Sequence, residues 1–131
     1  MNTECLFCNK KKQKIIYPSE IFFVVRDSYP VTKHHTLIIP HRHVSNFFDL
    51  NDEEFNDLKR VLKKQRQLLI DIDKEISAFN VGVNAGADAG QSIMHCHIHL
   101  IPRRKGDIAN PKGGVRGVIP SKQKYTKILK H

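Results

Sequence analysis

Hydrophobic and polar positions follow two different periods along the chain, and the shorter period predicts strands. Apolar runs rich in β-branched and aromatic residues lie at 15–17, 21–25 and 36–39. At 79–83 apolar residues alternate with polar or small ones, and a similar alternation occupies 95–101 after a glycine-rich loop. Such short runs between turn-forming residues are typical of β-strands.

The longer period predicts one long helix over 52–76. Asn51 suits its N-cap, and the three acidic residues that follow suit the positive end of the helix dipole. The helical stripe consists of Phe55, Leu58, Leu62, Leu69, Ile72 and Ile76. One long helix, shorter helical segments and several short strands predict an α+β domain built on an antiparallel sheet.

Composition narrows the class of protein. A length of 131 residues fits a single domain, and no apolar run approaches the roughly 20 residues that a membrane span needs. The N-terminus shows no basic-then-apolar leader, so we expect a cytoplasmic protein without a membrane partner. Three cysteines are too few for a disulfide framework, and the spacing Cys5-x-x-Cys8 indicates metal or redox chemistry.

The net charge of +9 is concentrated at one end of the chain. Residues 103–131 hold nine basic residues and one acidic residue, which gives this segment a net charge of +8. Such a segment attracts phosphate, on a nucleotide or along a nucleic-acid backbone, although a solvated tail would have the same composition. Nucleic acid is therefore a secondary candidate partner.

The most informative residues are His95, His97 and His99. On a strand their side chains project to one face at intervals of about 6.7 Å, while Cys96 and the next two apolar residues face the core. Imidazole can act as nucleophile, general acid or base in phosphoryl or nucleotidyl transfer. Three imidazoles can also form a catalytic zinc site, and the spacing alone leaves both chemistries open.

The surroundings of this row resemble the histidine triad family of nucleotide hydrolases and transferases. The segment from His95 to Ile101 is similar to the family's signature, and 90–92 stands where the family has its phosphate-binding turn. The resemblance covers about residues 4–103. It implies a five-stranded antiparallel sheet with helices, usually paired as a homodimer, and a purine nucleotide substrate.

The resemblance also implies a role for each matching residue. His97 would be the nucleophile that forms a covalent nucleotidyl-histidine intermediate, and His99 and His35 would contact phosphate or assist the leaving group. Asp27, eight residues before His35, would bind ribose hydroxyls. The side chains expected on α-phosphate oxygens are Asn84, Gln91, Ser92 and His99; the first and third also suit plain turn chemistry.

A branch of the same family completes a metal site from the Cys-x-x-Cys pair and two histidines. In this sequence the resemblance implies one structural zinc per chain, held by Cys5, Cys8, His43 and His95. Cys96 would point to the opposite face from His95 and is left out. The alternative is an unliganded, reduced pair of cysteines.

These features together predict an enzyme that acts at the α-phosphate of an adenosine or other purine nucleotide. Both a diadenosine polyphosphate and a nucleoside phosphoramidate stay open as substrates. The alternative is a nucleotide- or nucleic-acid-binding module with little turnover. We expect residues 1–103 to form the catalytic domain and 104–131 a basic extension, packed on or exchanged with the same domain. This extension would help to bind polyphosphate, and the family resemblance implies that Arg104, Lys112 or Arg116 would act in a neighbouring subunit.

Overall fold

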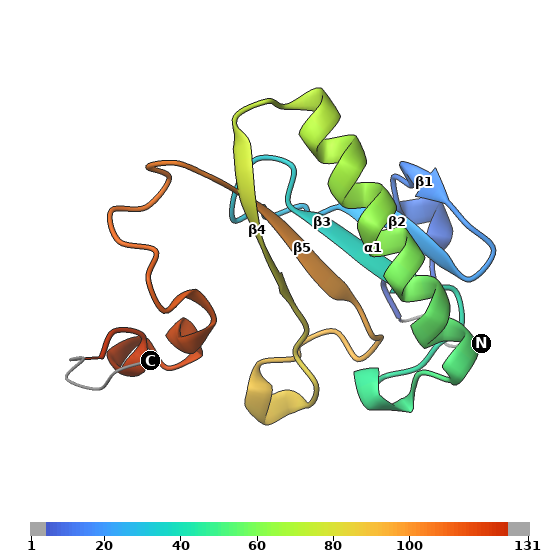
Figure 1. The fold of residues 1–131 in the computed structure, drawn as a ribbon. Coiled ribbons are helices and arrows are strands. Elements are labelled where there is room, and N and C mark those ends of the chain that lie inside the picture. The colour runs from blue at the N-terminus through green and yellow to red at the C-terminus, as the bar shows by residue number, and fades with distance from the viewer. Residues whose placement is uncertain (1–4, 126–131) are drawn as a thin grey trace.

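Five antiparallel strands form the sheet of the computed structural model, which describes residues 5–125 (Figure 1). The strands are β1 (Tyr17–Pro18), β2 (Phe22–Arg26), β3 (Thr36–Pro40), β4 (Ile76–Gly82) and β5 (Ile98–Arg104). Their order across the sheet is β1-β2-β3-β5-β4. The expected α+β class and five-stranded sheet are confirmed, and β5, which carries His99, lies between two neighbours.

Within residues 5–125, one long helix and five short 3-10 helices accompany the sheet. The helix α1 (Asp52–Ile72) crosses one face of the sheet. The 3-10 helices are η1 (Lys10–Lys12), η2 (Phe47–Asp49), η3 (Ala87–Ala89), η4 (Gly114–Val118) and η5 (Pro120–Lys122). No helix in the described part of the chain has the length and apolar character needed to cross a membrane.

Side chains that alternate along β2 and β3 build an apolar layer on each face of the sheet, and both strands are almost wholly buried. The layer beneath α1 includes Phe22, Val24, Ile38, Leu58 and Val61. The other layer includes Phe23, Val25, Leu37 and Ile39, with Cys5 and Phe7 packed on them. The N-terminal segment therefore covers a face of the sheet that α1 does not.

The helix α1 ends four residues before the predicted boundary. It begins as predicted, because Asn51 and Glu54 cap one another through reciprocal hydrogen bonds of 2.8 and 2.9 Å. It ends at Ile72, and Ile76 instead opens β4, where it is buried in the cluster that contains Leu69. Ile76 lies by chance at a helical spacing from Ile72, although a turn separates them. The sequence pattern alone therefore could not show that Ile76 belongs to the sheet.

The strand predicted over 95–101 lies three residues further along the chain. His95 precedes the ladder, and the Cys96 N–H instead donates to the Val44 carbonyl over 2.7 Å. Pro102 does not end β5 but pairs with β4, opposite Phe79. This is tolerated because β3 pairs with β5 only as far as Leu100, so the missing N–H of Pro102 costs no bond on that side.

Residues 105–125 follow the sheet as a series of turns beside β4 (Figure 1). Gly113 has φ +81°, and a Cβ at this position would lie 2.1 Å from the Gln123 carbonyl oxygen. The Arg116 guanidinium lies over the Tyr125 ring at 4.7 Å from its centroid. The turn thus requires glycine where the two 3-10 helices meet, and the segment folds on itself.

Candidate active site and metal site

The three histidines of the row occupy different environments. His95 is fully buried, whereas His97 and His99 are half-buried with ring centroids 5.3 Å apart. Cys96 is buried in the layer beneath α1, as expected, and burial raises the pKa of its thiol to about 12. The row therefore divides into one inner histidine and two that border open space.

His97 is held in a single tautomer by its own backbone neighbourhood. Its Nδ1–H donates to the carbonyl oxygen of His95 over 2.8 Å. Because a carbonyl oxygen can only accept, the proton of the neutral ring lies on Nδ1. The lone pair is left on Nε2, and the unprotonated nitrogen of a neutral imidazole is the one that can act as a nucleophile.

His35 and His99 form a directional pair. The Val31 backbone N–H donates to His35 Nδ1 over 3.0 Å, which places the His35 proton on Nε2. This Nε2–H donates to His99 Nδ1 over 2.8 Å, so the proton of neutral His99 lies on its outer nitrogen, Nε2. Burial lowers the pKa of both rings, and for His99 burial and the neighbouring His97 and His35 lower it to about 4. Both rings are therefore neutral at physiological pH, and His99 presents an N–H donor.

Asp27 lies beside this pair. Its Oδ2 is 3.5 Å from His35 Nε2, and its Oδ1 accepts from the Tyr29 N–H over 2.8 Å. Asp27, His97 and His99 line one cavity of about 340 Å³ together with Asn84 and Ser92. The structure thus brings five of the predicted catalytic and binding residues to one cavity.

Gln91 lies apart from that cavity and is buried. Its Oε1 accepts from the Gly86 N–H over 2.9 Å, and its Nε2 donates to the carbonyls of Ser45 and Ile93. Gly86 and Gly90 both have positive φ, as the turn between them requires. Gln91 therefore fixes the shape of the glycine loop, and both ends of its amide are already bonded to backbone.

A second cavity, of about 550 Å³, adjoins the first. His99 and Asn84 line both cavities, and His35 lines the second. Its far wall comes from η4, through Val115 and Val118. The two cavities therefore flank the histidine pair, with Asp27 in one and the C-terminal segment in the other.

The four predicted metal ligands converge. Their ligand atoms all lie within 4.8 Å of one another. His95 Nδ1 is 3.4 Å from Cys5 Sγ, 3.6 Å from Cys8 Sγ and 3.1 Å from His43 Nδ1, and Cys8 Sγ is 3.2 Å from His43 Nδ1. Around a tetrahedral ion with bonds of about 2.3 Å to sulfur and about 2.0 Å to nitrogen, ligand atoms are about 3.3–3.8 Å apart.

The hydrogen bonding of His95 also suits a metal. Its Nε2–H donates to the Pro40 carbonyl over 2.9 Å, so the lone pair of the neutral ring lies on Nδ1, among the cysteines. Burial lowers the pKa of His95 and keeps this form. The donor set, its spacing and this tautomer all fit a tetrahedral metal ion.

A second group with similar geometry does not fit a metal. Ligand atoms of Asp27, His35 and His99 also lie within 4.8 Å of one another. The atom that His35 offers to this group carries a proton, because Val31 N–H occupies the other nitrogen. Binding a metal there would move the proton to Nδ1 and set two N–H groups against each other, so the group suits hydrogen bonding instead.

Phe7 is a residue of the site that the sequence patterns did not single out. It stands between Cys5 and Cys8, is 4% exposed, and its ring meets the His97 ring edge-on at 5.1 Å between centroids. It also meets the His95 ring, at 5.9 Å. Only its position inside the Cys-x-x-Cys pair could have drawn attention to it.

Comparison with known families agrees with this fold and this row of histidines. The model of the HIT domain family matches residues 9–106, so the chain belongs to the HIT domain family. The match begins after Cys8, and the cysteine pair therefore lies outside it. The expected resemblance to histidine triad proteins is confirmed.

Individual relatives are similar in part of their length. The chain is 33% identical over 96 residues to a protein of Schizosaccharomyces pombe named bis(5'-nucleosyl)-tetraphosphatase [asymmetrical], covering 73% of this chain and 52% of that protein. It is 32% identical to an AP-4-A phosphorylase of Mycobacterium tuberculosis, covering 71% and 48%. The chain therefore spans about half the length of these two relatives.

A solved structure is similar over most of both chains. It is described as a Zn-bound histidine triad family protein from Mycobacterium smegmatis, with a TM-score of 0.73 and 29% sequence identity. The similarity covers 82% of this chain and 80% of that one.

Proposed function

We propose that this protein is a nucleotide hydrolase or nucleotidyl transferase that acts at the α-phosphate of an adenosine or other purine nucleotide. Membership of the HIT domain family and the relatives that are named for diadenosine tetraphosphate chemistry support this class. The observation that carries the proposal is the hydrogen bond from His97 Nδ1–H to the His95 carbonyl, 2.8 Å long, which directs a lone pair outward from Nε2.

The nucleoside monophosphate occupies the cavity that contains Asp27. The carboxylate of Asp27 accepts hydrogen bonds from ribose hydroxyls, as the family resemblance implies. The side chains of Asn84 and Ser92, which line this cavity beside Gly90, contact the α-phosphate oxygens. Gln91 supports this arrangement by holding the loop, so its contribution to phosphate binding is made through the loop's shape.

Transfer takes place in two balanced steps. In the first, His97 Nε2 forms a bond to the α-phosphorus, and the bond from phosphorus to the leaving group breaks. The leaving atom keeps the electron pair, accepts a hydrogen bond from His99 Nε2–H and takes a proton from solvent where it needs one. In the second, water attacks the phosphorus, the bond to His97 Nε2 breaks and leaves that ring neutral, and the proton of the water passes to solvent. His35 Nε2–H keeps the His99 ring oriented throughout.

The metal at the second site is zinc in this proposal, one ion per chain, held by Cys5, Cys8, His43 and His95. Two thiolates and two imidazoles are a usual donor set for structural zinc, and four protein ligands leave no open position for a substrate. When bound, the ion would fix the N-terminal segment to the residues that precede β5. It takes no part in the transfer steps.

A homodimer and a cytoplasmic location complete the proposal. The outer edge of β4 faces no other strand among the described residues, and Val81 on this strand is 49% exposed. None of the three cysteines forms a disulfide, which suits a reducing compartment. Light scattering on the purified full chain would measure its oligomeric state.

The test is an assay for release of the nucleoside monophosphate. The full chain is incubated with diadenosine tetraphosphate and, separately, with an adenosine phosphoramidate, and AMP is quantified. We expect AMP from at least one substrate with the native chain and almost none with His97→Ala. Tight nucleotide binding without AMP release from either substrate would contradict the proposal and favour a binding module.

A further inference from the structure

We propose that Thr32 is a positioning residue for the pair of His35 and His99. The inference rests on the proposed function, in which His99 Nε2–H donates a hydrogen bond to the leaving atom. Thr32 lines neither of the two cavities that flank the pair, so its side chain lies outside the space assigned to the substrate. It acts through a series of hydrogen bonds that ends at the two rings.

The loop over 27–35, which joins β2 to β3, is closed by its own hydrogen bonds. The Asp27 N–H donates to the His35 carbonyl over 2.9 Å, and the His35 N–H donates to the Thr32 carbonyl over 3.0 Å. The Val31 N–H donates to His35 Nδ1 over 3.0 Å. These three bonds fix the shape of the loop, but none of them reaches β5, the strand that carries His99.

The Thr32 hydroxyl fastens this loop to β5. It donates to the Pro102 carbonyl oxygen over 2.6 Å. Pro102 is buried and lies beyond Leu100, where the pairing of β3 with β5 ends. A buried carbonyl needs a hydrogen-bond donor. Thr32 therefore supplies the donor at a point that β3 no longer covers.

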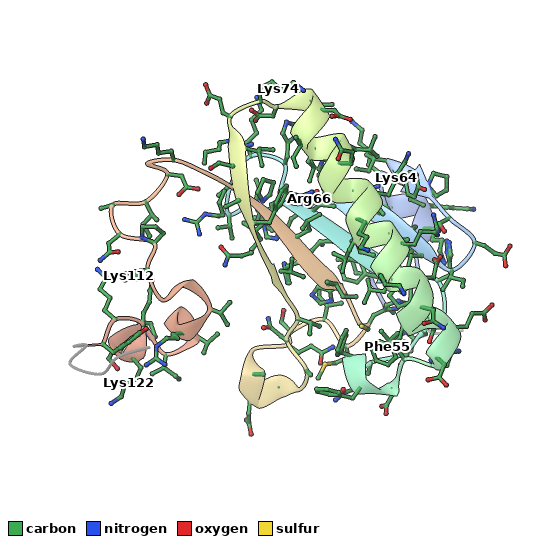
Figure 2. The ribbon with its side chains drawn as sticks, in the orientation of Figure 1. Phe55, Lys64, Arg66, Lys74, Lys112 and Lys122 are labelled. Atoms are coloured by element: carbon green, nitrogen blue, oxygen red, sulfur yellow. The ribbon has the colours of Figure 1, made fainter. Side chains whose placement is uncertain are left out.

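Arg104 makes a second link between the loop and β5. Its guanidinium donates to the Lys33 carbonyl over 3.0 Å and to Asp73 Oδ2 over 2.8 Å. Asp73 precedes Lys74, which lies in the turn that follows α1 (Figure 2). The long arginine side chain has many rotamers and can follow a displaced loop. The threonine hydroxyl is attached directly to Cβ, so its bond defines the position of the loop more closely.

One residue of the loop has an unfavourable backbone conformation. His34 has φ +73°, in the left-handed region that favours glycine. Such a conformation persists where surrounding contacts hold it. Thr36 provides one of these contacts, because its Oγ1–H donates to the His34 carbonyl over 2.7 Å, and Thr32 provides the contact to β5. A strained loop relaxes when a contact is removed, so loss of the Thr32 hydroxyl should displace His35.

The position of the loop determines where the ring protons lie. The Val31 N–H, adjacent to Thr32, places the His35 proton on Nε2, and this N–H in turn places the His99 proton on its outer nitrogen. If the loop moves away from β5, the bond of 2.8 Å between His35 Nε2 and His99 Nδ1 is lost. The His99 ring then exchanges between two tautomers, and only one of them presents an N–H to the leaving atom.

The first test removes the hydroxyl and keeps the shape of the side chain. AMP release is measured with the substrate, diadenosine tetraphosphate or an adenosine phosphoramidate, that the native chain cleaves. Thr32→Val should lower kcat about 10-fold with KM nearly unchanged, because the nucleotide contacts remain and only the donor is misplaced. Thr32→Ser keeps the hydroxyl and should restore kcat. Ile38→Val, in the layer beneath α1, is the stability control and should lower Tm without lowering kcat.

The second test uses the chain without substrate. In ¹⁵N NMR of the histidine side chains, we expect His99 as the Nε2–H tautomer in the native chain, in Thr32→Ser and in Ile38→Val. Thr32→Val should show an average of both tautomers. A native kcat or a native His99 signal in Thr32→Val would overturn the inference, as would the same losses in Thr32→Ser or Ile38→Val. Absence of AMP from both substrates with the native chain would instead contradict the proposed function.

Discussion

Two clusters in this molecule each contain a pair of histidines, but the histidines of one suit metal binding and those of the other suit hydrogen bonding. One gathers His43 and His95 with the two cysteines, and the other gathers His35 and His99 with Asp27. The difference lies in the partner of the second ring nitrogen. His95 donates to a carbonyl and turns a lone pair inward, whereas His35 accepts from an N–H and turns a proton inward.

This comparison explains why proximity of ligating atoms is not sufficient for a metal site. When a backbone carbonyl accepts from one ring N–H, the other ring nitrogen keeps a lone pair and can bind a metal. When a backbone N–H donates to one ring nitrogen, the other nitrogen carries the proton and can donate a hydrogen bond. His97 follows the pattern of His95, because a carbonyl oxygen accepts from one ring N–H, but its lone pair borders the cavity that Asp27 lines rather than two thiols. In the proposed function, the same residue type therefore acts as a metal ligand at His95, a nucleophile at His97 and a hydrogen-bond donor at His99.

The largest expected effect separates chemistry from stability. His97→Ala should lower kcat by about 1,000-fold or more, because the nucleophile is lost, while nucleotide affinity changes little. Its Tm should remain close to that of the native chain. Turnover measured beside equilibrium binding checks this, and near-native turnover would contradict the role of His97.

Removing a metal ligand should lower the stability of the fold rather than act directly on the chemical step. Cys5→Ser should abolish stoichiometric metal and lower Tm by roughly 10 °C or more, because the free energy of metal binding stabilises the fold. Elemental analysis and calorimetry of protein expressed with ample zinc measure both. Cys96→Ser is the matched control, since Cys96 is buried but outside the cluster, and it should keep about one metal per chain.

The second cluster gives a sharper version of the same test. His35→Gln should leave metal content at about one per chain, because the group around Asp27 binds none in this account. A second metal in the native chain that is lost in this variant would remove the distinction between the two clusters.

The cluster around Asp27 should leave a signature in the pH dependence of stability. A histidine whose pKa is lowered in the folded state binds a proton more readily when unfolded, so stability is lost as pH falls from about 6.5 to about 4 for His99. Each such histidine contributes a slope of up to about 1.4 kcal/mol per pH unit. Urea unfolding should show that the unfolding free energy of His99→Gln changes less steeply with pH across this range than that of the native chain. An unchanged slope would contradict a buried, neutral His99 in the folded chain.

A smaller effect is expected where α1 anchors the loop of His43. Arg42 bonds both carboxylate oxygens of Glu54, and these bonds hold the pKa of Glu54 below its ordinary value. Glu54→Gln should therefore cost about 1 kcal/mol at neutral pH. The gap should close as pH falls below about 4.5, where the native carboxylate becomes protonated. Unfolding at pH 7 and pH 3 measures it, and a pH-independent gap would contradict the ion pair.

The sequence predicts the sheet and the histidine row well because both depend on local periodicity. The alternation of His95, Cys96 and His97 directly implies which side chains reach the core. The end of α1 could not be predicted in this way, since Ile76 fits the helical stripe and is buried in the sheet instead. Pro102 was expected to end β5 because proline has no N–H to donate to a neighbouring strand. This does not apply here, since β3 pairs with β5 only as far as Leu100.

The tautomers and the cavity walls depend on contacts that no local pattern contains. Val31 N–H reaches His35 across a turn, and Pro40 C=O reaches His95 from 55 positions away. The charge of the C-terminal segment does not indicate that Val115 and Val118 line the cavity of about 550 Å³ or that Arg103 pairs with Asp107. Composition identifies what a segment contains, while the turn geometry decides which side chains it presents.

The most direct test of the central claim is to trap the nucleotide on the enzyme. The full chain is mixed with excess substrate and quenched under alkaline denaturing conditions, which preserve a bond between phosphorus and imidazole, and its peptides are mapped by mass spectrometry. The account predicts a nucleotidyl adduct on His97 that forms and decays at rates sufficient for turnover. An adduct on His35 or His99 instead, or active turnover with no adduct at any quench time, would contradict it.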